Sequence, residues 1–140
     1  MKISARNVFE GTIQNVTKGA VNAEVTLLLE GGGDVVAIIT NSSVDSLSLE
    51  KGKAAYAIIK ASEVIVGKDL DGTKLSARNV LAGKVTGVLD GGVNSEVAIR
   101  LLGGAAIVAS ITKGSVEALG LRQGDQVSAI IKASNVMIGI

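Results

Sequence analysis

The stretch Ile58-Ile59-Lys60-Ala61-Ser62 returns 72 positions later as Ile130-Ile131-Lys132-Ala133-Ser134, and this repetition sets the organisation of the whole chain. At the same offset, residues 1–68 align with residues 73–140 without a gap, and about half of the aligned pairs are identical. Two copies are too few for a solenoid, so the duplication predicts two tandem domains. We expect one domain over residues 1–68, a polar linker over residues 69–72 with a turn-forming Asp-Gly pair, and a second domain over residues 73–140.

Each copy has the pattern of short strands separated by glycine turns. In the first copy the expected strands lie at residues 8–16, 23–29, 35–40 and 54–66. A buried helix is the alternative for residues 54–66, but the Ile-Ile and Val-Ile-Val runs and the preceding Gly52 favour a strand. Between the last two segments we expect one short helix, capped by Ser42 or Ser43.

These elements predict a mostly β fold. Short strands in this order, with one helix before the last strand, are typical of a small five-stranded Greek-key barrel. We therefore expect two tandem OB-like five-stranded Greek-key barrels, each with one short helix.

The composition excludes several classes of function. The chain has no His and no Cys, so it offers no structural zinc site, no iron–sulfur cluster, no thiol nucleophile and no Ser–His pair. Its net charge of +1 and its lack of Trp, with one Phe and one Tyr, disfavour nucleic-acid partners, including an oligonucleotide-binding barrel. The carboxylates are scattered, so we expect a binding protein rather than an enzyme.

The apolar content indicates subunit interfaces. Hydrophobic residues make up 47% of the chain and charged residues 19%. A small domain cannot bury so much aliphatic surface internally, so we expect a homo-oligomer. The apolar runs are shorter than the roughly 18 residues of a membrane span, and the start lacks a hydrophobic signal core, so we expect a cytoplasmic protein with no membrane partner.

Hydroxyl and cationic side chains recur at matching positions of the two copies. In the first copy they are Ser4, Arg6, Thr40, Lys60 and Ser62, and in the second they are Ser76, Arg78, Thr112, Lys132 and Ser134. These groups donate hydrogen bonds, as do the backbone N–H groups of the glycine turns, whereas the oxygens of a tetrahedral oxyanion only accept them. The pattern is therefore compatible with an anion site, and ordinary surface residues at strand ends are the alternative.

The motifs Ser4-Ala5-Arg6-Asn7 and Lys60-Ala61-Ser62, with their second copies, resemble those of the molbindins, small cytoplasmic molybdate-binding proteins. The similarity covers nearly the whole chain and extends to the related domain of molybdate-responsive regulators and molybdate-transporter ATPases. It implies five-stranded barrels and a homotrimer of tandem chains. It also implies molybdate or tungstate at the subunit interfaces, with no catalytic cofactor and no metal ligated directly by the protein.

The resemblance also implies two kinds of oxyanion site. The inter-subunit site would use Ser4, Ala5, Arg6, Lys60, Ala61 and Ser62, with Thr40 from a neighbouring subunit, and in the second copy Ser76, Ala77, Arg78, Thr112, Lys132, Ala133 and Ser134. Axial sites would use the backbone of Gly19, Ala20, Val21 and Asn22, and of Gly91, Gly92, Val93 and Asn94. Lys18 becomes Asp90 beside the second turn, so the second axial site would depend on backbone donors or be weaker.

Two functions remain open at this point. The first is intracellular storage and buffering of molybdate or tungstate by reversible binding. The alternative is a non-catalytic oligomerisation or regulatory module, in which the recurring Ser, Arg and Lys residues serve only the interface. Oxyanion binding that survives competition from sulfate would distinguish the first from the second.

Overall fold

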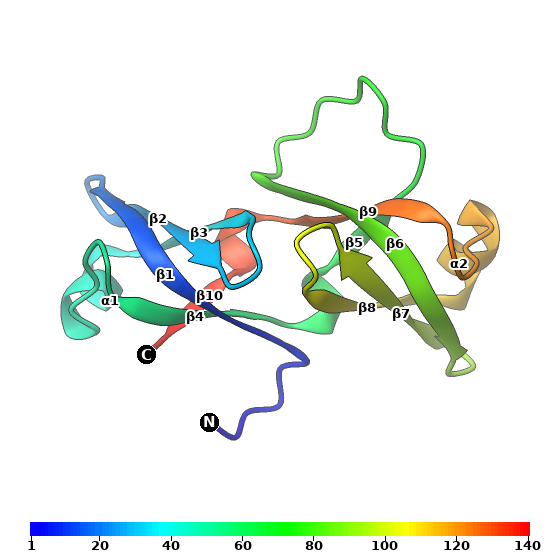
Figure 1. The fold of residues 1–140 in the computed structure, drawn as a ribbon, viewed down its shortest axis with the longest axis horizontal. Helices are drawn as coiled ribbons and strands as arrows, with labels where there is room; N and C mark the ends of the chain where they lie inside the picture. The colour runs from blue at the N-terminus through cyan, green and yellow to red at the C-terminus, as the bar shows by residue number, and fades with distance from the viewer.

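The computed structural model describes all residues, 1–140, and contains two five-stranded curled sheets side by side (Figure 1). The first repeat supplies β1 (Asn7–Lys18), β2 (Asn22–Leu29), β3 (Asp34–Thr40), β4 (Ala54–Ile59) and β5 (Ile65–Gly67). The second repeat supplies β6 (Asn79–Asp90), β7 (Asn94–Leu101), β8 (Ala106–Thr112), β9 (Gln126–Ile131) and β10 (Met137–Gly139).

Short helices interrupt the strands at equivalent places in the two repeats. The helices α1 (Asn41–Ser46) and α2 (Lys113–Leu119) follow the third strand of each repeat. The single-turn 3-10 helices η1 (Ala61–Glu63) and η2 (Ala133–Asn135) follow the fourth. The expected fold class, mostly β with two five-stranded units and one short α-helix in each, is confirmed. None of the helices has the length and hydropathy needed to cross a membrane.

Two local predictions were wrong. The single final strand expected over residues 54–66 is broken into β4, η1 and β5, because the chain turns at residues 61–63 and leaves the sheet. The helix cap is Thr40, not Ser42 or Ser43: the Thr40 hydroxyl accepts the backbone N–H of Ser43 at 3.0 Å. Threonine is a preferred cap residue as serine is, so residue type alone did not locate the cap.

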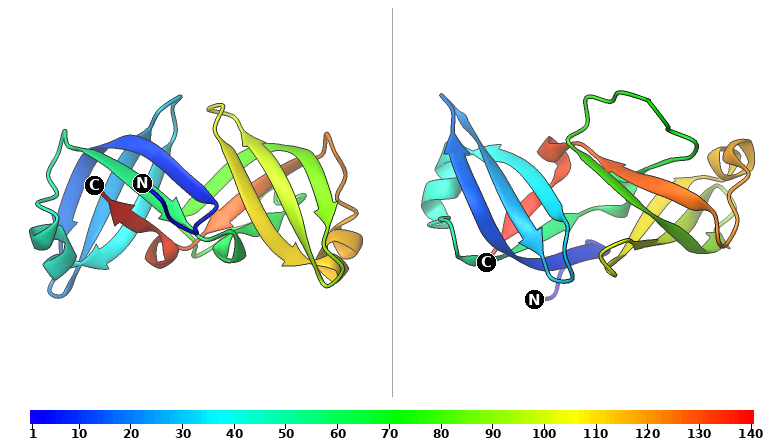
Figure 2. Two further views of the ribbon diagram at one scale, coloured as in Figure 1. Left: turned by 90° about the horizontal axis from the view of Figure 1, so that it is seen from below. Right: turned by 45° about the horizontal axis from the view of Figure 1, so that its top comes forward.

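The two sheets exchange their last strands. Their strand orders are β10-β4-β1-β2-β3 and β5-β9-β6-β7-β8. Thus β10 pairs with β4, with Ile138 opposite Ala57, and β5 pairs with β9, with Val66 opposite Ala129. In Figure 2 the red strand β10 lies at the edge of the sheet that the strands of the first repeat form. The boundaries expected at residues 68 and 73 describe the repeats of the sequence, and the strand pairing crosses them.

The exchange joins the two repeats through one hydrophobic core. A single cluster of buried side chains runs through both sheets. The segments that cross over bring Val64 and Val66 from the first repeat and Val136 from the second into this cluster, with 2%, 7% and 2% of their surface exposed. Because burial of aliphatic surface is the main favourable term in folding, each repeat contributes to the stability of the other.

Two buried asparagines tie an outer strand of each sheet to the opposite repeat. Asn7 donates from Nδ2 to the carbonyl of Val108 and accepts the Val108 N–H at Oδ1, both at 2.8 Å. Asn79 makes the same two bonds with Val36, also at 2.8 Å. Since β3 and β8 are edge strands, these amides satisfy backbone groups that the sheets leave unpaired.

The repeats meet asymmetrically at one pair of equivalent positions. Glu63 and Asn135 are 72 residues apart and face each other, with Asn135 Nδ2 donating to Glu63 Oε2 at 2.9 Å. Two glutamates at these positions would repel each other. The tandem chain avoids this because its two copies carry different residues there.

Replacing Asn7 by Ala should lower the free energy of unfolding by about 2–4 kcal/mol, because it leaves both backbone groups of Val108 without a partner. The measurement is equilibrium unfolding in urea. The control is Asn15→Ala on the same strand: the exposed Asn15 side chain bonds only Thr17, so this variant should stay within about 0.5 kcal/mol of the parent. Equal stability of the two variants would contradict the tying role of Asn7.

Candidate functional site

Six of the first-copy residues expected to hold an oxyanion line one cavity of about 360 Å³. Residues 4–6 precede β1, and residues 60–62 follow β4. The two segments lie side by side because β1 and β4 are antiparallel, with Asn7 opposite Ile59 at their paired ends. The structure thus brings together six of the predicted site residues: Ser4, Ala5, Arg6, Lys60, Ala61 and Ser62.

The second repeat supplies another part of this cavity's wall. Glu96 of β7, Ser110 of β8 and Met137 of β10 line it as well. The sequence analysis missed these three residues. The strand exchange and the hydrogen bonds between Asn7 and Val108 bring them to the first-repeat segments, and neither feature is visible in the sequence. One signal was present, since Glu24 and Glu96 keep their acidic character in both repeats.

Each site arginine forms an ion pair with a glutamate of the opposite repeat. Arg6 Nη1 lies 2.5 Å from Glu96 Oε1. Arg78 binds Glu24 through two nitrogens, with Nη1 2.8 Å from Oε2 and Nη2 3.3 Å from Oε1. The hydrogen bonds to Glu24, together with its charge, raise the pKa of the Arg78 guanidinium. Both ion pairs join the two repeats across their boundary.

Lys60 is the second cation of the cavity. It takes no part in the five ion pairs of the chain. With Arg6 it outweighs the single carboxylate of Glu96, and the hydroxyls of Ser4, Ser62 and Ser110 add neutral donors. Such a wall can hold an anion, because its ammonium, guanidinium and hydroxyl groups all donate hydrogen bonds.

The second-copy residues have the same relationship to their strands. Asn79 lies opposite Ile131, so residues 76–78 before β6 run beside residues 132–134 after β9. The surroundings differ from those of the first copy in two ways. Arg78 is paired through two nitrogens rather than one, and Ile38 stands where the first cavity has Ser110.

Neither Thr40 nor Thr112 lines the first-copy cavity. Thr40 is opposite Asn22 at the end of β2 and β3, next to the turn at residues 19–22. This turn follows β1, whereas the cavity residues precede β1, so the 12-residue strand separates them. Both threonine hydroxyls accept a helix N–H, from Ser43 at 3.0 Å and from Ser115 at 3.1 Å.

The two turns expected to form axial sites have different electrostatic surroundings. Beside the first turn, Lys18 forms an ion pair with Asp45. Beside the second, Asp90 accepts the N–H of Gly92 at 2.8 Å and pairs with Lys113 at 3.1 Å. Asp90 therefore occupies a backbone donor that an anion at this turn would need, which favours the expectation of a weaker second axial site.

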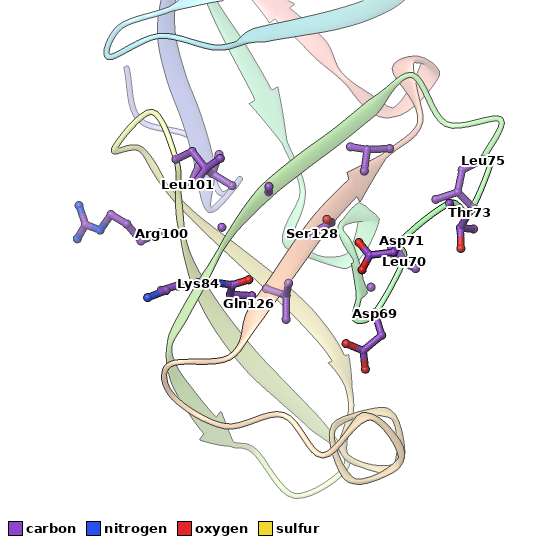
Figure 3. A pocket seen from close by; sticks show the side chains of 17 residues that line it. Asp69, Leu70, Asp71, Thr73, Leu75, Lys84, Arg100, Leu101, Gln126 and Ser128 are labelled. Atoms are coloured by element: carbon purple, nitrogen blue, oxygen red, sulfur yellow. The ribbon is translucent and has the colours of Figure 1, made fainter.

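A larger cavity, of about 800 Å³, lies between the linker and the sheet face of β6 and β9 (Figure 3). Lys84 and Arg100 lie at one end, and Asp69 and Asp71 of the linker lie at the other (Figure 3). None of the predicted site residues lines this cavity, and its cations and carboxylates are separated across it. Nor does the chain contain a group of three or more metal-ligating side chains.

The pKa of Asp90 tests the geometry at the second turn. The N–H of Gly92 and then the bond from Lys113 lower this pKa, so the stability that the group contributes is complete above the unfolded-state pKa of about 3.9. It is lost as the pH falls through the lower folded-state value. In Lys113→Ala the pKa should rise but stay below its ordinary value, because the Gly92 bond remains. Carboxyl-carbon NMR titration measures this, and an unchanged pKa in the variant would contradict the pairing.

Comparison with known proteins identifies both repeats with one family model. Residues 3–66 and 75–138 each match the model described as the TOBE domain. The chain is 40% identical over 140 residues to the molybdenum transport protein ModE of Herbaspirillum seropedicae, and 41% identical over 140 residues to the molybdenum-pterin-binding protein MopA of Rhodobacter capsulatus. Both alignments include the entire chain, which spans about half the length of these relatives, 52% and 53%.

A solved structure has the same arrangement of both repeats. The cytoplasmic molybdate-binding protein ModG, crystallised with molybdate bound, is 49% identical to this chain. The two superimpose with a TM-score of 0.97 over 100% of this chain and 99% of the other. A likeness of this extent covers the cavity and the two turns as well as the sheets.

Proposed function

This chain belongs to the TOBE domain family, with two tandem copies, and on that premise we propose that it binds molybdate, or the nearly identical tungstate, reversibly. The resemblance first noted at residues 4–7 and 60–62 is thereby confirmed at the level of the family. One observation carries the proposal: the cavity gathers Arg6, Lys60 and the hydroxyls of Ser4 and Ser62. The bound molybdate of ModG and the names of ModE and MopA support the choice of ligand.

The chemistry of the cavity suits a tetrahedral dianion. Its four oxygens only accept hydrogen bonds, and they meet ammonium, guanidinium, hydroxyl and backbone N–H donors. Neutral donors supply part of the site, so a chain with a net charge of +1 can still hold an anion. In this proposal the anion is bound and released without being transformed.

We place this binding in a homotrimer in the cytoplasm, where it stores and buffers the anion. Exposed aliphatic side chains support an assembly, because Leu89, Val93 and Leu102 have 67%, 84% and 85% of their surface exposed. In an assembly, Thr40 would reach the cavity of a neighbouring subunit, since in its own chain it lies beyond the far end of β1. The description of ModG as cytoplasmic supports the compartment.

A second candidate is an oligomerisation or regulatory module that binds no oxyanion. The observation in its favour is that Arg6 and Arg78 already have carboxylate partners in the opposite repeat. In that case the arginines serve only to hold the repeats together.

Replacing Lys60 by Ala separates the two candidates. If the cavity binds molybdate, the variant should bind it about 10- to 100-fold more weakly, the effect of losing one charge-assisted hydrogen bond. Titration calorimetry in excess sulfate measures this. The matched control is Lys84→Ala, which removes a cation from the larger cavity and should leave molybdate affinity unchanged.

Two results would contradict the proposal. The first is a parent chain that releases no heat with molybdate while keeping its oligomeric mass, which favours the module without ligand. The second is equal molybdate affinity in Lys60→Ala and the parent, which removes Lys60 and its cavity from the site.

A further inference from the structure

A carboxylate stands in the wall of the cavity that we propose for molybdate. Glu96 lines the same 360 Å³ space as Arg6 and Lys60, and its Oε1 accepts from Arg6 Nη1 at 2.5 Å. A carboxylate in an anion cavity raises the energy of the bound state, because like charges repel at short range. The position of Glu96 in this wall therefore needs an explanation.

We propose that Glu96 is an internal counter-anion, which occupies Arg6 in the unliganded protein and which the incoming oxyanion must displace. The inference rests on the proposed function and concerns how that site sets its affinity. A carboxylate oxygen and a molybdate oxygen accept the same kind of charge-assisted hydrogen bond from a guanidinium. The two anions therefore compete for the same donors of Arg6.

Competition, rather than joint binding, follows from the protonation of the ligand. A fully deprotonated dianion has no proton to donate, and an ionised carboxylate has none either. No hydrogen bond can therefore join Glu96 to the bound oxyanion, and only their repulsion remains. The side chain of Glu96 is 39% exposed, so it can turn toward solvent when the oxyanion arrives.

The equivalent arginine–glutamate pair, Arg78 with Glu24, has more hydrogen bonds. Glu24 holds Arg78 through two hydrogen bonds, at 2.8 and 3.3 Å, whereas Glu96 holds Arg6 through one. An oxyanion at the second-copy site must break both bonds. We therefore expect the site at Arg78 to be the weaker of the two in the parent chain.

The displacement also crosses the boundary between the repeats. Arg6 belongs to the first repeat and Glu96 to the second, and the reverse holds for Arg78 and Glu24. Each binding event thus exchanges a contact between repeats for a contact with the ligand. A competing carboxylate lowers the affinity for the oxyanion and leaves every hydrogen-bond donor of the site in place. Such a limit on affinity helps a protein that must later release its ligand.

Glu96→Gln tests the inference, because the amide keeps an oxygen that accepts from Arg6 while the negative charge is lost. A counter-anion predicts about tenfold tighter binding of sodium molybdate than in the parent, and Glu24→Gln should also gain affinity. A group that only positions Arg6 predicts equal or weaker binding. Glu50→Gln is the charge-matched control at an exposed loop position, and its affinity should stay within about twofold of the parent.

Titration calorimetry with molybdate in excess sulfate gives the affinities of the parent and of each variant, and circular dichroism confirms that each is folded. Glu96→Ala is measured beside Glu96→Gln, since it removes the acceptor as well as the charge. A parent that binds molybdate while neither Glu96 variant binds it more tightly overturns this inference alone. Absence of binding in the parent and in every variant overturns the proposed function together with it.

Discussion

Neither sheet of this chain has its fifth strand until the opposite repeat supplies it. The turns at η1 and η2 carry β5 and β10 across, and the valines of these segments bury themselves in a core shared by both repeats. The amides of Asn7 and Asn79 then bond the outer strands β8 and β3. The two repeats therefore share one core and complete each other's sheets, although the sequence is a clear duplication.

The candidate site is a consequence of this exchange. The segments at Arg6 and Lys60 come from the first repeat, but Glu96, Ser110 and Met137 of the second complete the cavity wall. A tandem chain can also place different residues at equivalent positions where the repeats meet, as Glu63 and Asn135 show. A homodimer of identical single repeats would bring the same residue to both positions, and the two site sets could not diverge.

The sequence predicted the duplication and the fold class, because both follow from local pattern. The grouping of residues 4–6 with residues 60–62 came from the family resemblance, and the pairing of β1 with β4 shows why these segments lie side by side. The sequence did not predict the break in the segment 54–66. A run of apolar residues has the same pattern whether it forms one strand of one sheet or two strands of different sheets. Arg6 and Glu96 are 90 residues apart, and their pairing depends on the exchange of strands between the repeats. A local sequence pattern therefore cannot predict this ion pair. Thr40 was assigned by resemblance, and its capping bond became visible only in three dimensions.

The central claim is that the oxyanion binds in the cavity between the repeats. Crystals of the molybdate complex, with anomalous diffraction recorded at the molybdenum absorption edge, test it most directly. The account predicts an anomalous peak within hydrogen-bonding reach of Arg6 and Lys60, with the Glu96 carboxylate turned away from the guanidinium. Peaks only elsewhere, such as in the larger cavity beneath the linker, or no peak in crystals that hold saturating molybdate, would contradict it.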